Sequence, residues 1–136
     1  WGVEYASYSR KLCEGNARAE GVDNAVFQKG DARHLDFPDA TFDAVTSNYV
    51  YHNITGADKQ ALLRESLRVL KKGGVFAIHD LMEPSRYGDM DEFLRKLREE
   101  GFQEVRLIPT ADGTFMTPRE GKSLFLSGSA LLVGRK

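Results

Sequence analysis

Two short apolar runs, each followed within a few residues by small and polar side chains, most constrain the fold of this 136-residue chain. The first run covers residues 25–27 and precedes Gly30 and Asp31, and the second covers residues 42–45 and precedes the sequence Thr-Ser-Asn at 46–48. Strands that end in this way are typical of parallel α/β sheets, which bind ligands outside the carboxyl ends of their strands. The sequence therefore predicts a functional region over residues 30–53.

The order of the apolar patterns predicts an alternating α/β domain. The expected elements are helices near residues 7–20, 57–70 and 89–100, a short helix after Thr117, and strands near residues 25–29, 42–47, 75–78, 105–108 and 130–133. The last two strands lack a full crossover helix between them, so an antiparallel pair is expected. We expect one domain over residues 1–136, because the chain has no repeat, no low-complexity tract and no linker-like segment.

Local sequence signals predict where several of these helices begin and end, and which of their residues face the core. Ser7 or Ser9 is expected to cap the first helix, and Gly21 to end it. Gly73 and Gly74 are expected to end the second helix with a tight turn into a strand. The residues expected to face the core are Leu63, Leu67 and Leu70 in the second helix, and Met90, Phe93, Leu94 and Leu97 in the third.

Composition excludes several classes of function. The net charge of −1, with both signs spread along the chain, offers no electrostatic footprint for nucleic acid. No apolar run reaches the roughly 20 residues of a membrane span. The single cysteine, Cys13, cannot form an internal disulfide, which agrees with a cytoplasmic location. A small-molecule substrate is therefore the expected partner, with no membrane and no nucleic acid.

Other catalytic and cofactor motifs are missing from the sequence. One cysteine and three scattered histidines have no zinc-ligand spacing, so no metal site is expected. The chain has no phosphate loop of the GK[ST] type and no G-x-S-x-G nucleophile turn.

Several ordered motifs resemble those of class I S-adenosylmethionine-dependent methyltransferases. They are GDA at residues 30–32, LDFP at 35–38, FDAV at 42–45 and LKKGG at 70–74. The resemblance covers nearly the whole chain. It implies an α/β, three-layer Rossmann-like fold with a mostly parallel sheet and an antiparallel last strand, and S-adenosylmethionine as cofactor.

The resemblance also implies roles for individual residues. Gly30, Asp31 and Ala32 are expected to bind the donor, with Asp31 and the Ala32 amide at the adenine ring. Asp31 as a simple turn cap is the alternative.

Asn48 and Tyr49 are expected to bind the donor as well, with Asn48 holding its methionine part or orienting the acceptor. His52 is a candidate general base, because its ordinary pKa lies near neutrality. A surface histidine without a catalytic role is the alternative. His79 and Asp80 are weaker candidates and are expected to be a polar pair bonded to the backbone.

Two parts of the family pattern have no counterpart in the sequence. These are the glycine-rich motif after the family's first strand and the acidic residue that ends its second strand and binds the ribose. The resemblance implies that both precede Trp1, so the chain is expected to be a C-terminal portion without the N-terminal strands and to be inactive by itself. A sheet opened in this way is expected to expose strand edges that favour homo-oligomers.

Two other functions remain open. The first is a non-catalytic binding or assembly module that uses an exposed sheet edge. The second is a dinucleotide-dependent oxidoreductase, although its G-x-G-x-x-G fingerprint is absent from these residues.

Overall fold

A computed structural model describes residues 9–136, which divide into two compact units, one ending at Asp31 and the other comprising Ala32–Lys136. The first unit contains one helix, and the second contains a sheet with its covering helices. The helices are α1 (Arg10–Ala19), η2 (Tyr51–Asn53), α2 (Lys59–Arg68), α3 (Pro84–Tyr87), α4 (Met90–Glu99) and α5 (Pro118–Ser123), and the strands are β1 (Phe42–Asn48), β2 (Leu70–Leu81), β3 (Gln103–Pro109) and β4 (Ser129–Arg135).

Helix α1 begins and ends with the expected capping residues. The Ser9 hydroxyl accepts a hydrogen bond from the Leu12 amide at 3.2 Å, while Ser7 lies outside the described residues. At the other end, Gly21 has a φ of 72°, and its amide donates to the Arg18 carbonyl. Glycine takes this left-handed conformation without a steric penalty, which is why the helix stops here.

The strand expected over residues 25–29 is wrong. These residues form no strand, and the side chain of Val26 is 85% exposed. An extended segment becomes a strand only when its backbone groups pair with a neighbour, and no strand among residues 9–136 pairs with this one. Its backbone groups face water, which satisfies them equally well.

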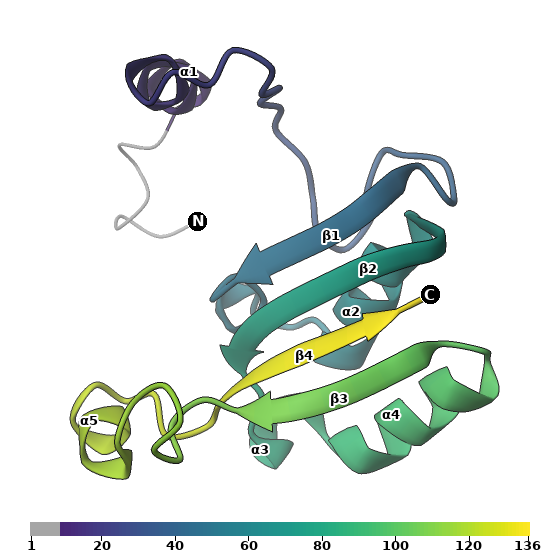
Figure 1. The fold of residues 1–136 in the computed structure, drawn as a ribbon, viewed down its shortest axis with the longest axis vertical. Coiled ribbons are helices and arrows are strands. Elements are labelled where there is room, and N and C mark those ends of the chain that lie inside the picture. The colour runs from purple at the N-terminus through teal and green to yellow at the C-terminus, as the bar shows by residue number, and fades with distance from the viewer. Residues whose placement is uncertain (1–8) are drawn as a thin grey trace. The chain divides into compact units, whose positions relative to one another are not determined.

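The sheet has the order β1-β2-β4-β3 (Figure 1). β1 and β2 are parallel, whereas β4 runs antiparallel to both β2 and β3. Three strands therefore point the same way and the last one is reversed, which confirms the expected α/β fold with a mixed sheet. In the pairing of β1 with β2, Asn48 lies opposite His79, so both strands bring polar residues to the same edge.

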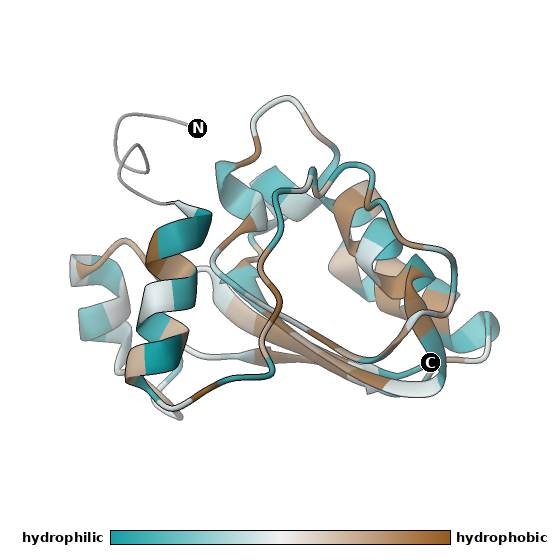
Figure 2. Cartoon of the chain, turned by 90° about the horizontal axis from the view of Figure 1, so that it is seen from above, coloured by the Kyte–Doolittle hydropathy of each residue, from teal (hydrophilic) through white to brown (hydrophobic). Residues whose placement is uncertain are grey.

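Helices α2 and α4 lie on one face of this sheet, so the unit supplies two of the three expected layers (Figure 1). All seven side chains predicted to face the core from the second and third helices are buried. They pack against strand residues such as Phe76, Ile78, Val105 and Leu132. Figure 2 shows the strands as largely hydrophobic, whereas hydrophobic and hydrophilic residues alternate along the helices, as expected when each helix buries one face.

Gly73 and Gly74 do not form the expected turn after a helix. Both lie inside β2, where the pairing with β1 shifts from Phe42 opposite Leu70 to Ala44 opposite Val75. Gly73 has a φ of 81°, which lets the strand form this irregularity. Tertiary pairing with β1 thus extends the strand through a sequence that local preference assigns to a turn.

Replacing Gly74 by alanine is expected to lower the free energy of unfolding by about 1–3 kcal/mol. A Cβ atom at this position would lie 2.7 Å from Leu70 Cδ1 and 2.9 Å from the carbonyl oxygens of Asp43 and Lys71. Urea denaturation measures the effect. Gly15→Ala is the control, because a Cβ there meets no atom within 4 Å; equal losses in the two variants would contradict the packing argument.

Candidate functional site

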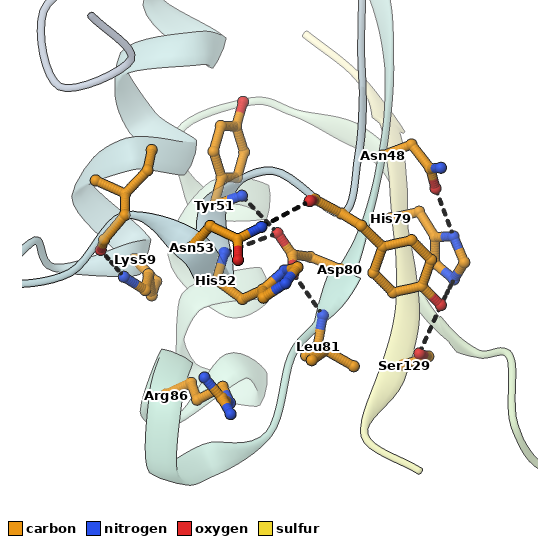
Figure 3. Close-up of polar contacts among 12 residues, drawn as sticks. Asn48, Tyr51, His52, Asn53, Lys59, His79, Asp80, Leu81, Arg86 and Ser129 are labelled. Carbon is orange, nitrogen blue, oxygen red and sulfur yellow. Dashed lines mark hydrogen bonds and ion pairs between the residues drawn. The ribbon is translucent and has the colours of Figure 1, made fainter. Parts of the chain in front are cut away.

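The candidate site lies where β1 and β2 end, and its central group is the carboxylate of Asp80. This side chain is 0% exposed and accepts four hydrogen bonds. Oδ1 accepts from His52 Nδ1 at 2.6 Å and from the Leu81 amide at 2.7 Å. Oδ2 accepts from the amides of Tyr51 at 2.8 Å and His52 at 3.1 Å (Figure 3). Asp80 therefore joins the end of β2 to the short helix η2.

His52 is oriented by this carboxylate. Because an ionised carboxylate only accepts hydrogen bonds, Nδ1 of His52 carries a proton, so in the uncharged form of the ring the lone pair lies on Nε2. The side chain of His52 is 20% exposed. The arrangement is that of a histidine whose tautomer and direction are set by a buried acid, which is a recurring way to position a general base.

A second polar cluster surrounds His79. Its Nδ1 contacts Asn48 Oδ1 at 2.9 Å, and its Nε2 contacts Thr110 Oγ1 at 2.9 Å. The phenol of Tyr49 bonds to Ser129 Oγ at 2.8 Å, and its ring centroid lies 4.6 Å from that of His79. The side chains of Asn48, His79 and Ser129 gather at this end of the sheet (Figure 3). Burial lowers the pKa of His79.

Tyr49 has a backbone conformation that non-glycine residues rarely adopt. Its φ is 51°, and its amide donates to the His79 carbonyl at 2.8 Å. Such a conformation persists only where surrounding contacts hold it, and it is found preferentially at functional sites. Here it turns the chain sharply from β1 into η2, which brings His52 to Asp80.

Two buried tyrosines lie beneath the Asp80 carboxylate. The Tyr51 hydroxyl bonds to Ser66 Oγ at 2.6 Å, and burial raises the pKa of Tyr51 despite this hydrogen bond. Tyr87 is 2% exposed, and burial, together with the nearby charge of Asp80, raises its pKa. Both phenols therefore stay protonated in the neutral range.

The predicted site residues fall into three groups. Asn48, Tyr49 and His52 lie together at the carboxyl edge of β1, as expected. Ala32 is half-buried and packs against the core of the second unit. Gly30 and Asp31 are exposed residues at the end of the first unit, so the expected convergence of Asp31 and Asn48 in one cleft stays a prediction.

Sequence reasoning underestimated Asp80 and missed two residues of the site. Asp80 does bond to the backbone, as expected for a strand-end pair, but it also holds the ring of His52. Thr110 and Ser129 have no local signal: Thr110 directly follows β3 and Ser129 is the first residue of β4, both far along the chain from His79 and Tyr49. They reach His79 and Tyr49 only because β4 lies between β2 and β3.

The chain has the Rossmann-like fold of the class I S-adenosylmethionine-dependent methyltransferases. Residues 1–78, more than half of the chain, match the family described as a methyltransferase domain. The chain belongs to this family.

Individual relatives agree with that membership. The chain is 35% identical over 96 residues to an uncharacterized methyltransferase, YcgJ, of Bacillus subtilis, covering 71% of this chain and 37% of YcgJ. It is 31% identical over 88 residues to a demethylmenaquinone methyltransferase of Geobacillus stearothermophilus, covering 65% of this chain and 37% of that enzyme. The chain thus spans 37% of the length of each of these relatives. The relatives support S-adenosylmethionine-dependent methyl transfer in general and do not identify an acceptor.

Solved structures show the same fold. The crystal structure of the [4+2]-cyclase SpnF matches with a TM-score of 0.63 and 22% identity, covering 93% of this chain and 61% of SpnF. YcgJ from Bacillus subtilis matches with a TM-score of 0.56 and 21% identity, covering 93% of this chain and 77% of that chain. SpnF is a cyclase, which illustrates that this fold alone does not determine the reaction.

Among residues 9–136, no helix has the length and apolar character needed to cross a membrane. The same residues contain no group of three or more histidine, cysteine, aspartate or glutamate side chains placed to hold a metal ion.

Proposed function

We propose that the whole protein containing this chain transfers a methyl group from S-adenosylmethionine to a small-molecule acceptor. We propose further that the C-terminal ends of β1 and β2 face this acceptor. The observation that carries the proposal is the His52–Asp80 pair, held at 2.6 Å at the strand ends of a methyltransferase-family domain. A small acceptor is supported by the mixed surface charge and by the partly buried position of His52.

The donor-binding role rests on the chemistry of the residues present. The Asp31 carboxylate is suited to accept from the amino group of adenine, and the Ala32 amide to donate to a ring nitrogen. The exposed Asn48 amide is suited to bind the polar tail of the donor. When bound, S-adenosylmethionine supplies an electrophilic methyl group on a sulfonium centre.

In this proposal His52 is the general base, and Asp80 orients it and stabilises its charged form. Nδ1–H of His52 donates to Asp80, so Nε2 can take a proton from an acidic group of the acceptor. The imidazolium that results is stabilised by the buried Asp80 carboxylate, which does not itself need to take the proton. Positioning of the acceptor against the donor supplies the rest of the rate increase.

Replacing Asp31 by alanine in the whole protein is expected to weaken the binding of S-adenosylhomocysteine by about 10- to 100-fold, the loss typical of a hydrogen bond to a charged group. Isothermal titration calorimetry measures the dissociation constant. Asp23→Ala, another exposed aspartate of the same unit, is the matched control. Equal affinities of the two variants would contradict the adenine-binding role, and a wild-type protein that binds no S-adenosylhomocysteine would overturn the proposed function.

A second candidate function is self-association or partner binding through β1. Of the four strands described, β1 pairs only with β2, so its other edge has no strand partner within residues 9–136. Unpaired strand edges readily join another strand. Analytical ultracentrifugation tests this proposal, because a sedimentation coefficient of a monomer at every concentration would contradict it.

A further inference from the structure

The cluster around His79 does not take part in the proton transfer assigned to His52 and Asp80. His79 lies on β2 opposite Asn48 of β1, and both of its ring nitrogens have hydrogen-bond partners: Nδ1 contacts Asn48 Oδ1, and Nε2 contacts Thr110 Oγ1 at 2.9 Å and, at 3.5 Å, the hydroxyl of Tyr49. The ring also packs against that of Tyr49, whose hydroxyl is bonded to Ser129. Contacts from three strands and their connections thus hold the imidazole in one orientation (Figure 3).

The hydrogen-bond pattern assigns the proton on this ring. The carbonyl oxygen of an asparagine side chain can only accept, so the Nδ1 atom of His79 must donate to it. The Thr110 hydroxyl can then donate to the lone pair on Nε2. A neutral imidazole with its proton on Nδ1 thus satisfies both ring nitrogens of His79.

This assignment decides what Asn48 offers to a ligand. The oxygen of its amide is used by His79, while its NH2 group has no hydrogen-bond partner among residues 9–136. The residue is exposed at the carboxyl edge of the sheet. Asn48 therefore presents two N–H donors and no free acceptor at the place where a ligand would bind.

We propose that His79 is a positioning residue that holds the Asn48 amide with its NH2 group toward the ligand, and that the group recognised there is an oxygen acceptor, either a carboxylate or a carbonyl. The proposal rests on the function proposed above for the site itself. The oxygen can belong to the amino acid tail of the donor or to the methyl acceptor, and binding measurements distinguish these sources.

Nuclear magnetic resonance of the 15N-labelled chain tests the orientation without any ligand. Long-range 1H–15N correlations report which ring nitrogen carries the proton, and we expect Nδ1–H for His79. A proton on Nε2 at neutral pH would overturn the proposal whatever the protein binds. The expected tautomer in a protein that binds no donor would contradict the proposed function instead and leave the His79–Asn48 contact established.

Two substitutions at His79 separate positioning from simple packing. In His79→Asn the amide nitrogen of the new side chain can replace Nδ1 and keep the hydrogen bond to Asn48. In His79→Gln the longer side chain reaches toward Thr110, and the hydrogen bond to Asn48 is lost. We expect affinity for the ligand to fall about tenfold in His79→Gln and to change little in His79→Asn. The reason is that only His79→Gln leaves the Asn48 side-chain amide without its hydrogen bond, so that it can rotate. Equal losses in both variants, with unchanged melting temperatures, would overturn the positioning role.

Binding of two probes to the whole protein shows which molecule carries the recognised oxygen. S-Adenosylhomocysteine carries the amino acid carboxylate and 5′-methylthioadenosine lacks it. A loss in His79→Gln confined to S-adenosylhomocysteine assigns the oxygen to the donor. Unchanged affinity for both probes, with a raised KM for the acceptor, assigns it to the acceptor, and no change in any of these quantities would overturn the proposal.

Discussion

Replacing His52 by asparagine is expected to lower the rate of methyl transfer by about 10²- to 10⁴-fold, the usual contribution of a positioned general base. The asparagine amide nitrogen can occupy the place of Nδ1 and donate to Asp80 Oδ1, so the buried carboxylate keeps its partner. What is lost is Nε2, the atom that takes the proton. The variant thus removes the base and leaves the contacts of the site in place.

The measurement is the initial rate of tritiated methyl transfer by the whole protein to the small molecule that a panel of acceptors identifies. Asn53→Ala serves as the control, since Asn53 is an exposed neighbour whose amide donates only to the Tyr49 carbonyl, at 3.3 Å. An unchanged kcat in His52→Asn would show that the acceptor needs no base and that His52 has no catalytic role. Calorimetry with S-adenosylhomocysteine separates this outcome from a loss of donor binding.

Replacing Asp80 by alanine is expected to lower the free energy of unfolding by about 3–5 kcal/mol, because several donors lose their acceptor at a cost of about 1–3 kcal/mol for each one that is buried. The carboxylate accepts from three backbone amides and one imidazole, and alanine leaves all four donors without an acceptor. A buried donor without a partner loses its hydration and gains nothing in return. The substitution is also expected to free η2 from the end of β2.

Urea denaturation followed by circular dichroism measures this loss. Asp112→Ala is the matched control, because Asp112 is an exposed aspartate that caps a turn by accepting from the Thr114 amide at 3.1 Å. Surface changes of this kind usually alter stability by no more than about 0.5 kcal/mol. Similar losses in the two variants would contradict the structural role of Asp80.

Much of the second unit could be predicted from local patterns. The spacing of Phe93, Leu94 and Leu97 predicts the buried face of α4, and these three side chains are among the most buried of the described residues. The short helix expected after Thr117 is formed as α5, and Thr117 and Glu120 make a capping box at its start. Such signals involve only residues within one or two helical turns, so they do not depend on how the rest of the chain folds.

Strand predictions were less reliable because a strand depends on a partner. Residues 42–48 become β1 by pairing with β2, whereas residues 25–29 have an apolar run of similar character and no partner strand within the described chain. The same dependence explains Gly73 and Gly74, whose local preference for a turn is overridden by pairing within the sheet. Sequence patterns alone do not report which strand edges meet.

Spacing along the chain was enough to predict the family of this protein, the faces that its helices bury, and the placement of Asn48, Tyr49 and His52 at the end of one strand. Only the tertiary structure decided that Asp80 orients His52 and that Thr110 and Ser129 close the cluster around His79 and Tyr49. These contacts join residues between 28 and 80 positions apart in the sequence. The His52–Asp80 contact arises because β1 pairs with β2, and the contacts of Thr110 and Ser129 arise because the reversed β4 lies between β2 and β3. Both arrangements bring distant strand ends together and are set by the packing of the whole sheet.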